Sequence, residues 1–193
     1  MTCFFSDVAG FTSISERLRP EELVDLLNRY LTSMTDVIFE NGGYVDKYMG
    51  DGIMAFWNGL LKQPDHAERA CRCALQSMKR LAELNEELKR RGLVPLGARI
   101  GINTGEMVVG NMGSRERFDY TVVGDAVNLA SRLEGANKET ADKAKAVELL
   151  LKSKDDDAMT RAGIALMKGD GVKKFQQAMS DMGFALPGSA DGS

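Results

Sequence analysis

The chain reads Tyr44-Val-Asp-Lys-Tyr-Met-Gly-Asp-Gly-Ile-Met-Ala-Phe-Trp57 between two long stretches of helical pattern. Two runs rich in β-branched and aromatic residues flank the sequence Gly50-Asp51-Gly52. Runs of this composition around a short glycine-containing turn are typical of a β-hairpin. The stretch therefore predicts two antiparallel strands with an acidic residue, Asp51, in the turn between them.

A long helix is predicted on each side of this hairpin. Before it, apolar residues keep the three- and four-residue spacing of one buried helical face between Pro20 and Asn41. After it, the same spacing runs from a capping-box pattern at Asp65 and Glu68 to a glycine stop at Gly92.

Shorter elements complete the pattern. We expect a strand, a second hairpin of two strands, a further strand and a third helix at residues 2–8, 98–103 with 106–110, 118–123 and 126–136. The order β-α-β-β-α-β-β-β-α predicts an α+β protein with a ferredoxin-like βαββαβ core. Such a core has a mainly antiparallel sheet with helices packed on one face.

The composition indicates an ordinary globular protein of one domain with an appendage. Of its 193 residues 44% are hydrophobic and 27% are charged. A net charge of −3 argues against a nucleic-acid-binding surface, which is normally basic. No apolar run approaches the ~20 residues that span a bilayer, and no signal-peptide pattern is present. We expect neither nucleic acid nor membrane to contact this segment.

Cysteine and histidine usage limits the chemistry further. Cys3, Cys71 and Cys73 are odd in number and badly spaced for a disulfide framework or a zinc site, which favours a reducing cytosol. His66 is the only histidine. Any metal must therefore be held by carboxylates, which favours Mg²⁺, Mn²⁺ or Ca²⁺.

Two aspartates are candidates for such a site. Asp7 ends the first predicted strand and Asp51 lies in the hairpin turn. If these strands are neighbours, both carboxylates reach the same edge of the sheet and together attract divalent cations. Taken singly, each also fits a loop or turn aspartate. Gly10, just after Asp7, leaves backbone N–H groups for phosphate oxygens.

Other polar residues have ordinary explanations when they are considered one at a time. Lys47 fits a solvated lysine, and Arg99 fits a surface ion pair. Asn128 and Arg132 are four residues apart and share one helical face, a spacing that often occurs by chance.

Four segments that carry these residues occur in order and together resemble the catalytic domain of class III nucleotidyl cyclases. They are Phe5–Thr12, Lys47–Gly52, Arg99–Gly105 and Phe118–Arg132. The resemblance covers residues 3–138. It implies conversion of a nucleoside triphosphate to a 3′,5′-cyclic monophosphate and pyrophosphate, in a homodimer with two Mg²⁺ or Mn²⁺ ions per site, for intracellular signalling.

The resemblance also implies roles for individual residues. The metal ligands would be Asp7, Asp51 and the backbone of Val8, the substrate contacts Gly10, Phe11, Thr12 and Arg99, the purine contacts Lys47 and Thr121, the ribose-orienting residue Asn128 and the transition-state residue Arg132. In this family the metal aspartates come from one chain, and the purine-contacting residues, asparagine and last arginine come from the other. One chain that carries both sets implies two equivalent sites.

The purine contacts carry the choice of nucleotide. Guanylyl cyclases typically have Glu and Cys at these two positions, so Lys47 with Thr121 favours ATP. Thr121 is similar to the class IIIb adenylyl cyclases, which respond to bicarbonate, and therefore implies stimulation by bicarbonate.

The last part of the chain departs from the family pattern. We predict no strand in residues 139–193 and interpret them as an atypical helical or partly disordered tail after a catalytic domain at residues 1–138. The family's closing hairpin carries a further phosphate-binding lysine, whereas Lys168 fits a turn between helices.

The leading prediction is an adenylyl cyclase. The alternatives are a catalytically poor cyclase-fold module for dimerisation or regulation, and a guanylyl cyclase. The expected location is cytoplasmic, either as a separate protein or as the cytosolic domain of a larger membrane-bound one.

Overall fold

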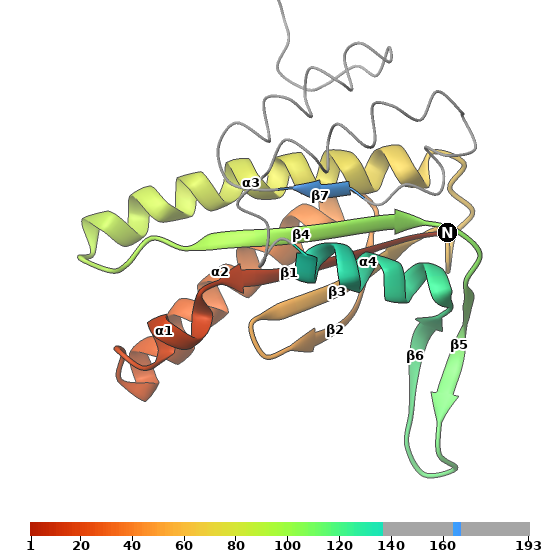
Figure 1. Cartoon of the computed structure of the whole chain (residues 1–193), viewed down its shortest axis with the longest axis horizontal. Coiled ribbons are helices and arrows are strands. Elements are labelled where there is room, and N and C mark those ends of the chain that lie inside the picture. The colour runs from red at the N-terminus through yellow and green to blue at the C-terminus, as the bar shows by residue number, and fades with distance from the viewer. Residues whose placement is uncertain (137–163, 167–193) are drawn as a thin grey trace, which may run out of the picture.

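The computed structural model describes residues 1–136 and 164–166, and Figure 1 shows their arrangement. Its elements are β1 (Thr2–Ala9), α1 (Phe11–Ser15), α2 (Pro20–Glu40), β2 (Tyr44–Met49), β3 (Gly52–Trp57), α3 (His66–Arg90), β4 (Gly97–Thr104), β5 (Val108–Gly113), β6 (Phe118–Val123), α4 (Asp125–Ala136) and β7 (Ile164–Leu166). The main sheet has the strand order β2-β3-β1-β4-β7, and β5 pairs with β6 in a separate two-stranded sheet.

Every strand pair in the main sheet is antiparallel. The segment from β1 through α2, β2, β3 and α3 to β4 gives the order β2-β3-β1-β4, which is the predicted ferredoxin-like core. The hairpin β2–β3 is also confirmed. Because β1 is central, its residues pair on both sides, so that Ser6 lies opposite Ile53 of β3 and Ile100 of β4.

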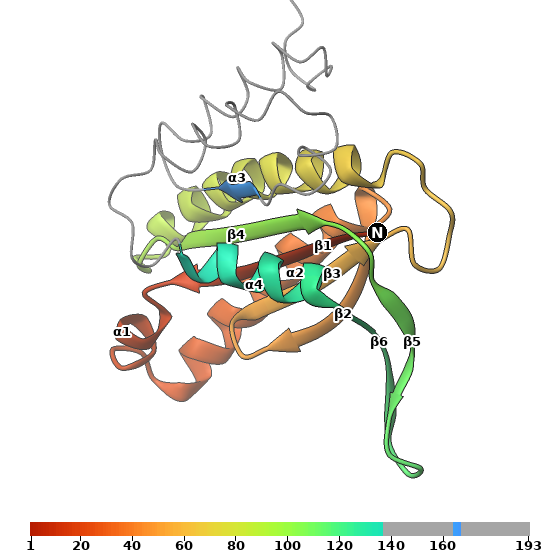
Figure 2. The same ribbon diagram turned by 45° about the vertical axis from the view of Figure 1, so that its right-hand side comes forward.

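The two faces of β1 belong to two different cores. Phe4 and Val8 point into the larger core, which packs under α2 and α3, as the helical spacing predicts. Cys3 and Phe5 point the other way, into a smaller core that α4 closes with Val127. Figures 1 and 2 show α2 behind the sheet and α4 in front of it. None of the helices in the described ranges has the length and apolar character needed to cross a membrane.

The predicted second hairpin is wrong. Strand β4 pairs with β1 and β7, whereas β5 pairs with β6, from Val108 opposite Val123 to Gly113 opposite Phe118. Both edges of β4 are therefore occupied, and β5 must find its partner elsewhere. The β5–β6 hairpin extends away from the main sheet, as Figures 1 and 2 show. Its turn closes with a hydrogen bond from Ser114 N–H to the Arg117 carbonyl at 2.8 Å.

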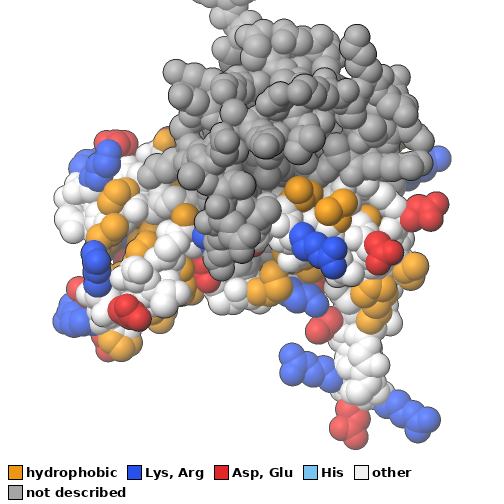
Figure 3. Space-filling model, in the orientation of Figure 1, with side chains coloured by type: hydrophobic (Ala, Val, Ile, Leu, Met, Phe, Trp, Pro, Cys, Tyr) orange, Lys and Arg blue, Asp and Glu red, His pale blue; other side chains and the backbone are white. Residues whose placement is uncertain are grey.

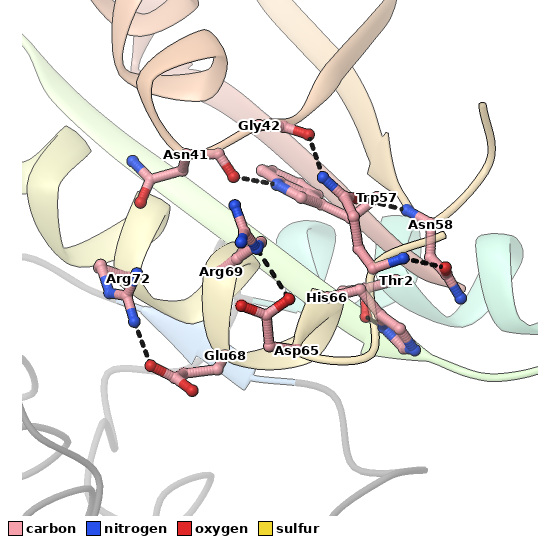
Figure 4. Close-up of polar contacts among 11 residues, drawn as sticks. Thr2, Asn41, Gly42, Trp57, Asn58, Asp65, His66, Glu68, Arg69 and Arg72 are labelled. Atoms are coloured by element: carbon pink, nitrogen blue, oxygen red, sulfur yellow. Dashed lines mark hydrogen bonds and ion pairs between the residues drawn. The ribbon is translucent and has the colours of Figure 1, made fainter. Parts of the chain in front are cut away.

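The capping box predicted at the start of α3 is also wrong. Asp65 is the N-cap residue but makes no side-chain cap, because its carboxylate accepts from Arg69 Nε at 2.8 Å. Glu68 likewise pairs with Arg72, one turn further along the helix. Figure 4 shows both carboxylates pointing towards these arginines. Ion pairs four residues apart have replaced the cap.

Two further elements were not expected from the sequence. The short helix α1 begins directly after Gly10, whose φ of 72° is the left-handed conformation that glycine adopts without strain. Strand β7 lies within residues 139–193, where no strand was predicted, and Ile102 of β4 pairs with Ile164 at its start. The rest of that segment, including Lys168, lies outside the described residues.

Helix α4 approaches β4 through a glycine. A Cβ atom added at Gly101 would lie 2.3 Å from the Ala130 carbonyl oxygen and 2.4 Å from the Glu134 backbone nitrogen. Backbone atoms cannot yield as the end of a flexible side chain can. Only glycine at this position lets α4 pack directly on the sheet.

We therefore expect Gly101→Ala to lower the free energy of unfolding by about 1–3 kcal/mol, because overpacking forces the backbone apart. Gly110→Ala is the matched control in β5, since nothing lies within 4 Å of an added Cβ there. Urea unfolding followed by circular dichroism measures both variants. Equal stabilities for the two variants would contradict the close approach of α4.

Candidate active site

Asp7 and Asp51 lie at the same edge of the main sheet. The Asp51 carboxylate Oδ2 accepts a hydrogen bond from the Val8 backbone N–H at 3.1 Å, so the β2–β3 turn packs against the end of β1. Gly52 supports this approach, since a Cβ atom added there would lie 3.2 Å from the Ser6 carbonyl oxygen. The structure thus brings together two residues that are 44 positions apart in the chain.

Arg99 lies between two carboxylates beside this edge. Its guanidinium contacts Asp7 Oδ2 at 2.5 Å and Glu134 Oε1 of α4 at 2.9 Å. The three side chains are largely buried, with 13% of Arg99, 23% of Asp7 and 15% of Glu134 exposed. Arg99 is therefore in an internal ion-pair network rather than in a surface pair. Glu134 was not anticipated, because its partner is 35 residues away.

Burial and charge act on this network in opposite directions. Burial raises the pKa of Glu134, the Arg99 guanidinium lowers it, and the nearby Asp7 carboxylate raises it again, so the net shift is upward. Burial alone would lower the pKa of Arg99, but its hydrogen bonds to Asp7 and Glu134 outweigh this, and its pKa is raised. Arg99 therefore stays charged and offsets the charge of both carboxylates.

The donor set at this edge suits a hard divalent cation. Oδ1 of Asp7 is buried and accepts no hydrogen bond within the described part of the chain, so it is available as a ligand. Asp51 supplies a second carboxylate beside it. Within residues 1–136 and 164–166 no group of three or more Asp, Glu, His or Cys side chains forms a larger metal cluster. Oxygen ligands from two carboxylates are typical of Mg²⁺ bound together with substrate phosphates.

A second cluster joins the two predicted purine contacts. The Thr121 hydroxyl donates to Asp46 Oδ2 at 2.5 Å, and Lys47 Nζ lies 3.2 Å from Asp46 Oδ1. Thr121 is buried, whereas Lys47 is 40% exposed. One aspartate thus holds β2 and β6 together at the residues that the sequence analysis paired. Asp46 itself was missed, since in a regular strand it would alternate with Lys47 and face the other way.

Asn128 and Arg132 lie on the exposed face of α4. Val127 and Ala130 on the same helix are buried against the sheet. Neither Asn128 nor Arg132 has a side-chain hydrogen bond or ion pair within the described residues, and no such contact joins them to Asp7 or Asp51. The helix presents this pair outwards rather than to the carboxylate edge of its own chain.

The chain after Asp7 turns sharply into α1. Gly10 forms the turn, and its carbonyl accepts hydrogen bonds from the N–H groups of Ser13 and Ile14. Phe11 packs against the larger core and Thr12 follows it in the first helical turn. The first N–H groups of a helix, here those of Phe11 and Thr12, have no partner inside the helix. Gly10, Phe11 and Thr12 thus follow directly on Asp7 and Val8 at the carboxylate edge.

The β5–β6 hairpin carries large hydrophobic side chains in exposed positions. Val108 is 66% exposed, Phe118 61% and Val123 48%. Leu129 of α4 is also exposed. Figure 3 shows hydrophobic side chains on this side of the molecule, and charged side chains gathered at the end of the projecting hairpin. This apolar surface near the Asn128 and Arg132 face of α4 is available for contact with another chain.

The chain matches known proteins along most of its length. The sequence model of the family described as the Adenylate and Guanylate cyclase catalytic domain matches residues 1–179. Adenylate cyclase 1 of Rhizobium meliloti (strain 1021) is 43% identical over 139 residues, 72% of this chain and 21% of that protein. Adenylate cyclase of Anabaena cylindrica is 40% identical over 143 residues, 72% of this chain and 28% of that protein. The chain belongs to the adenylate and guanylate cyclase catalytic domain family.

Solved structures of both kinds of cyclase share the fold. The adenylyl cyclase CyaB from P. aeruginosa superposes with a TM-score of 0.68 at 43% identity, covering 70% of each chain. The guanylyl cyclase Cya2 has a TM-score of 0.67 at 48% identity, covering 70% of this chain and 68% of that one. These matches confirm the family expected from the four sequence segments. The chain spans only 21% and 28% of the two curated relatives named above.

The ion-pair network gives a stability prediction that needs no substrate. Arg99→Met leaves Asp7 and Glu134 without their shared cation, and we expect it to lower the free energy of unfolding by about 1–3 kcal/mol in metal-free buffer. The loss should be larger at pH 8 than at pH 5. The pKa of Glu134 is already raised in the folded wild type, and without the guanidinium it rises further above its unfolded value, so stability falls as the pH increases.

Arg80→Met is the matched control for this prediction. Arg80 also contacts two glutamates, at 3.5 and 3.6 Å, but Glu40 and Glu83 are more than half exposed. Such surface pairs contribute less than about 1 kcal/mol. Urea unfolding at the two pH values measures both variants. A pH-independent loss in Arg99→Met would rule out the network as described.

Proposed function

We propose that the chain is the catalytic domain of an adenylyl cyclase that converts ATP to 3′,5′-cyclic AMP and pyrophosphate in cytoplasmic signal transduction. Its site would be composite, with the metal-binding residues from one protomer and the purine, ribose and transition-state residues from its partner. The observation that carries the proposal is the separation of these two sets within one chain. Asp7 and Asp51 share one edge, whereas Asn128 and Arg132 face outwards from α4.

Two divalent cations, Mg²⁺ or Mn²⁺, are proposed at the carboxylate edge. Asp7, Asp51 and the Val8 backbone would hold them. When bound, such cations lower the pKa of the ribose 3′-hydroxyl and offset charge on the triphosphate. Arg99 would lie next to the phosphates, together with the backbone of Gly10, Phe11 and Thr12.

The reaction itself is an intramolecular displacement. The ribose 3′-oxygen bonds to the α-phosphorus while the bond to the bridging oxygen of pyrophosphate breaks, and the hydroxyl proton passes to solvent. Asn128 would orient the ribose for this attack. The planar guanidinium of Arg132 is suited to the spread charge of the transition state, which a lysine would match less well.

The choice of ATP over GTP is proposed to rest on Lys47 and Thr121. Lys47 can donate to a ring nitrogen of adenine, and the Thr121 hydroxyl can accept from the adenine amino group. A guanine would leave these groups mispaired, at about 1–3 kcal/mol for each buried unsatisfied group. Lys47 and Thr121 both contact Asp46, and this proximity supports their action on one base.

A homodimer with two equivalent sites is the assembly proposed for this activity. The exposed apolar side chains of the β5–β6 hairpin and the exposed face of α4 support it, because a partner chain can contact both surfaces. The catalytically poor module and the guanylyl cyclase are the remaining alternatives. The similarity to the guanylyl cyclase Cya2 keeps the second of these open to test.

Product formation tests the proposal directly, and complementation between variants tests the composite site. We expect the wild-type chain with Mn²⁺ to form cyclic AMP from ATP, at a specific rate that rises with protein concentration. Asp51→Asn and Arg132→Ala should each lose more than about 100-fold in kcat. Mixed in equal amounts they should regain about a quarter of the wild-type rate, because half of the dimers carry one intact site.

Asp36→Asn, on the exposed face of α2, should keep the wild-type rate. Cyclic GMP from GTP without cyclic AMP from ATP would favour the guanylyl alternative. No product from a folded wild-type sample would favour the catalytically poor module, and inactive mixtures of the two variants would exclude a site shared between protomers.

Stimulation by bicarbonate stays a prediction of the resemblance at Thr121. We expect the initial rate to increase when sodium bicarbonate replaces sodium chloride at fixed pH and ionic strength. The comparison is made with the wild-type chain at saturating Mn²⁺ and ATP. An unchanged rate would remove the prediction without affecting the proposed reaction.

A further inference from the structure

Asp46 occupies an irregular position in strand β2. Val45 pairs with Ala55 of β3, and Lys47 pairs with the preceding residue, Met54, so that Asp46 is one extra residue in the ladder. A β-bulge of this kind sets two consecutive residues opposite one residue of the partner strand and is often found next to active sites. The bulge places Asp46 and Lys47 on the same face of β2, and there the Asp46 side chain is completely buried.

The buried carboxylate has a stabilising group beside each of its oxygens. Oδ2 accepts from the Thr121 hydroxyl at 2.5 Å and from the Val122 backbone N–H at 3.4 Å. Oδ1 accepts no hydrogen bond of good geometry within the described residues, but it lies 3.2 Å from the Lys47 ammonium group. An unpaired buried carboxylate would be strongly unfavourable, so these three contacts account for its presence in the interior.

The direction of the Thr121 hydrogen bond determines what Thr121 can offer to a ligand. A threonine hydroxyl has a single hydrogen and two lone pairs. Because the hydrogen points to Asp46, a ligand group that approaches the same hydroxyl meets lone pairs only. A 6-amino group of a purine can donate to them, whereas a 6-oxo group presents a second acceptor and finds no hydrogen.

We therefore propose that Asp46 is a positioning residue that fixes the hydrogen-bond polarity of Thr121 and so makes the site prefer a 6-amino purine. The inference rests on the proposed cyclase function and concerns a residue outside the set of predicted substrate contacts. Asp46 also holds the flexible Lys47 side chain by its ammonium group, which fixes where that cation meets the base.

Two substitutions of Asp46 separate its effect on the polarity of the Thr121 hydroxyl from its effect on the position of the Lys47 ammonium group. Asp46→Ala removes the acceptor, so the Thr121 hydroxyl can turn its hydrogen towards a 6-oxo group. We expect the ratio of kcat/KM for ATP to that for GTP to fall about tenfold, as the mispairing penalty disappears. Both nucleotides are measured with Mn²⁺ in the wild type and in the variant.

Asp46→Asn should behave differently. Its amide oxygen must face the Val122 N–H, which is a donor, so it still accepts from Thr121. Its NH₂ group then faces Lys47 and displaces the ammonium group. We expect the ATP to GTP ratio to stay within about twofold of the wild type, while KM for ATP rises about tenfold and kcat changes less.

If Asp46 only stabilises the fold, the two variants should show a different kinetic pattern. Both variants would then lose activity with ATP and GTP in parallel, with the ratio unchanged, and this result would overturn the inference. Asp36→Asn on the surface of α2 is the matched control and should keep both constants. Thermal unfolding by circular dichroism establishes that each variant is folded before its kinetics are compared.

If Asp46→Ala does not fold, inosine triphosphate carries the same test in the wild-type chain. This nucleotide has the 6-oxo group of GTP without its 2-amino group. We expect the wild type to use it about tenfold less well than ATP, and Thr121→Val to lose most of that difference. Equal use of ATP and inosine triphosphate by the wild type would overturn the inference.

Failure of the inference differs from failure of the proposed function. A wild-type chain that forms no cyclic AMP contradicts the proposed function. A wild-type chain that prefers ATP, with the same preference in folded Asp46→Ala, contradicts only the role of Asp46.

Discussion

The pairing of β1 with β3 on one side and with β4 on the other is the constraint on which the rest of the structure depends. This register places Asp7 opposite Arg99 and brings the β2–β3 turn to the Val8 backbone. A slip of one residue would turn Asp7 and Arg99 to opposite faces of the sheet. The buried side chains on both faces of β1 prevent such a slip, since Phe4 and Phe5 belong to different cores. Packing on both faces therefore fixes the carboxylate edge.

Helix α4 depends on the same register at two points. The Asn103 amide donates to the Ala126 carbonyl near the helix start, and Arg99 binds Glu134 near its end. Between them, Gly101 lets the helix backbone touch β4. With the helix fixed at both ends, the residues that cannot face the sheet must face outwards. Asn128 and Arg132 are among these, so their exposure follows from how α4 is attached.

Much of this arrangement could be predicted from the sequence, because local patterns encode it. Helical spacing gave α2 and α3, and the residues around Asp51 gave the β2–β3 hairpin. The partners of β5 and β7 could not be predicted in this way, since pairing between distant strands leaves no local signal. The capping box predicted at Asp65 does not form, because Arg69 binds the Asp65 carboxylate. Asp46 was missed because regular alternation would put it on the face opposite to Lys47, whereas the single inserted residue brings both to one face. The roles of the site residues remain predictions.

Overall similarity to cyclases of known type does not distinguish the two nucleotides in this fold. The guanylyl cyclase Cya2 shares 48% of its aligned residues with this chain, and the adenylyl cyclase CyaB shares 43%, at nearly the same TM-score. Since a guanylyl and an adenylyl cyclase match this chain about equally well, the choice of nucleotide must depend on a few local hydrogen bonds. A buried polar group that lacks its partner costs about 1–3 kcal/mol, which is roughly 5- to 150-fold in affinity. Two such groups are enough to separate adenine from guanine, provided that the protein fixes which of them donates and which accepts. In this chain Asp46 takes the only hydrogen of the Thr121 hydroxyl, and that contact is internal, so the polarity is in place before any nucleotide binds.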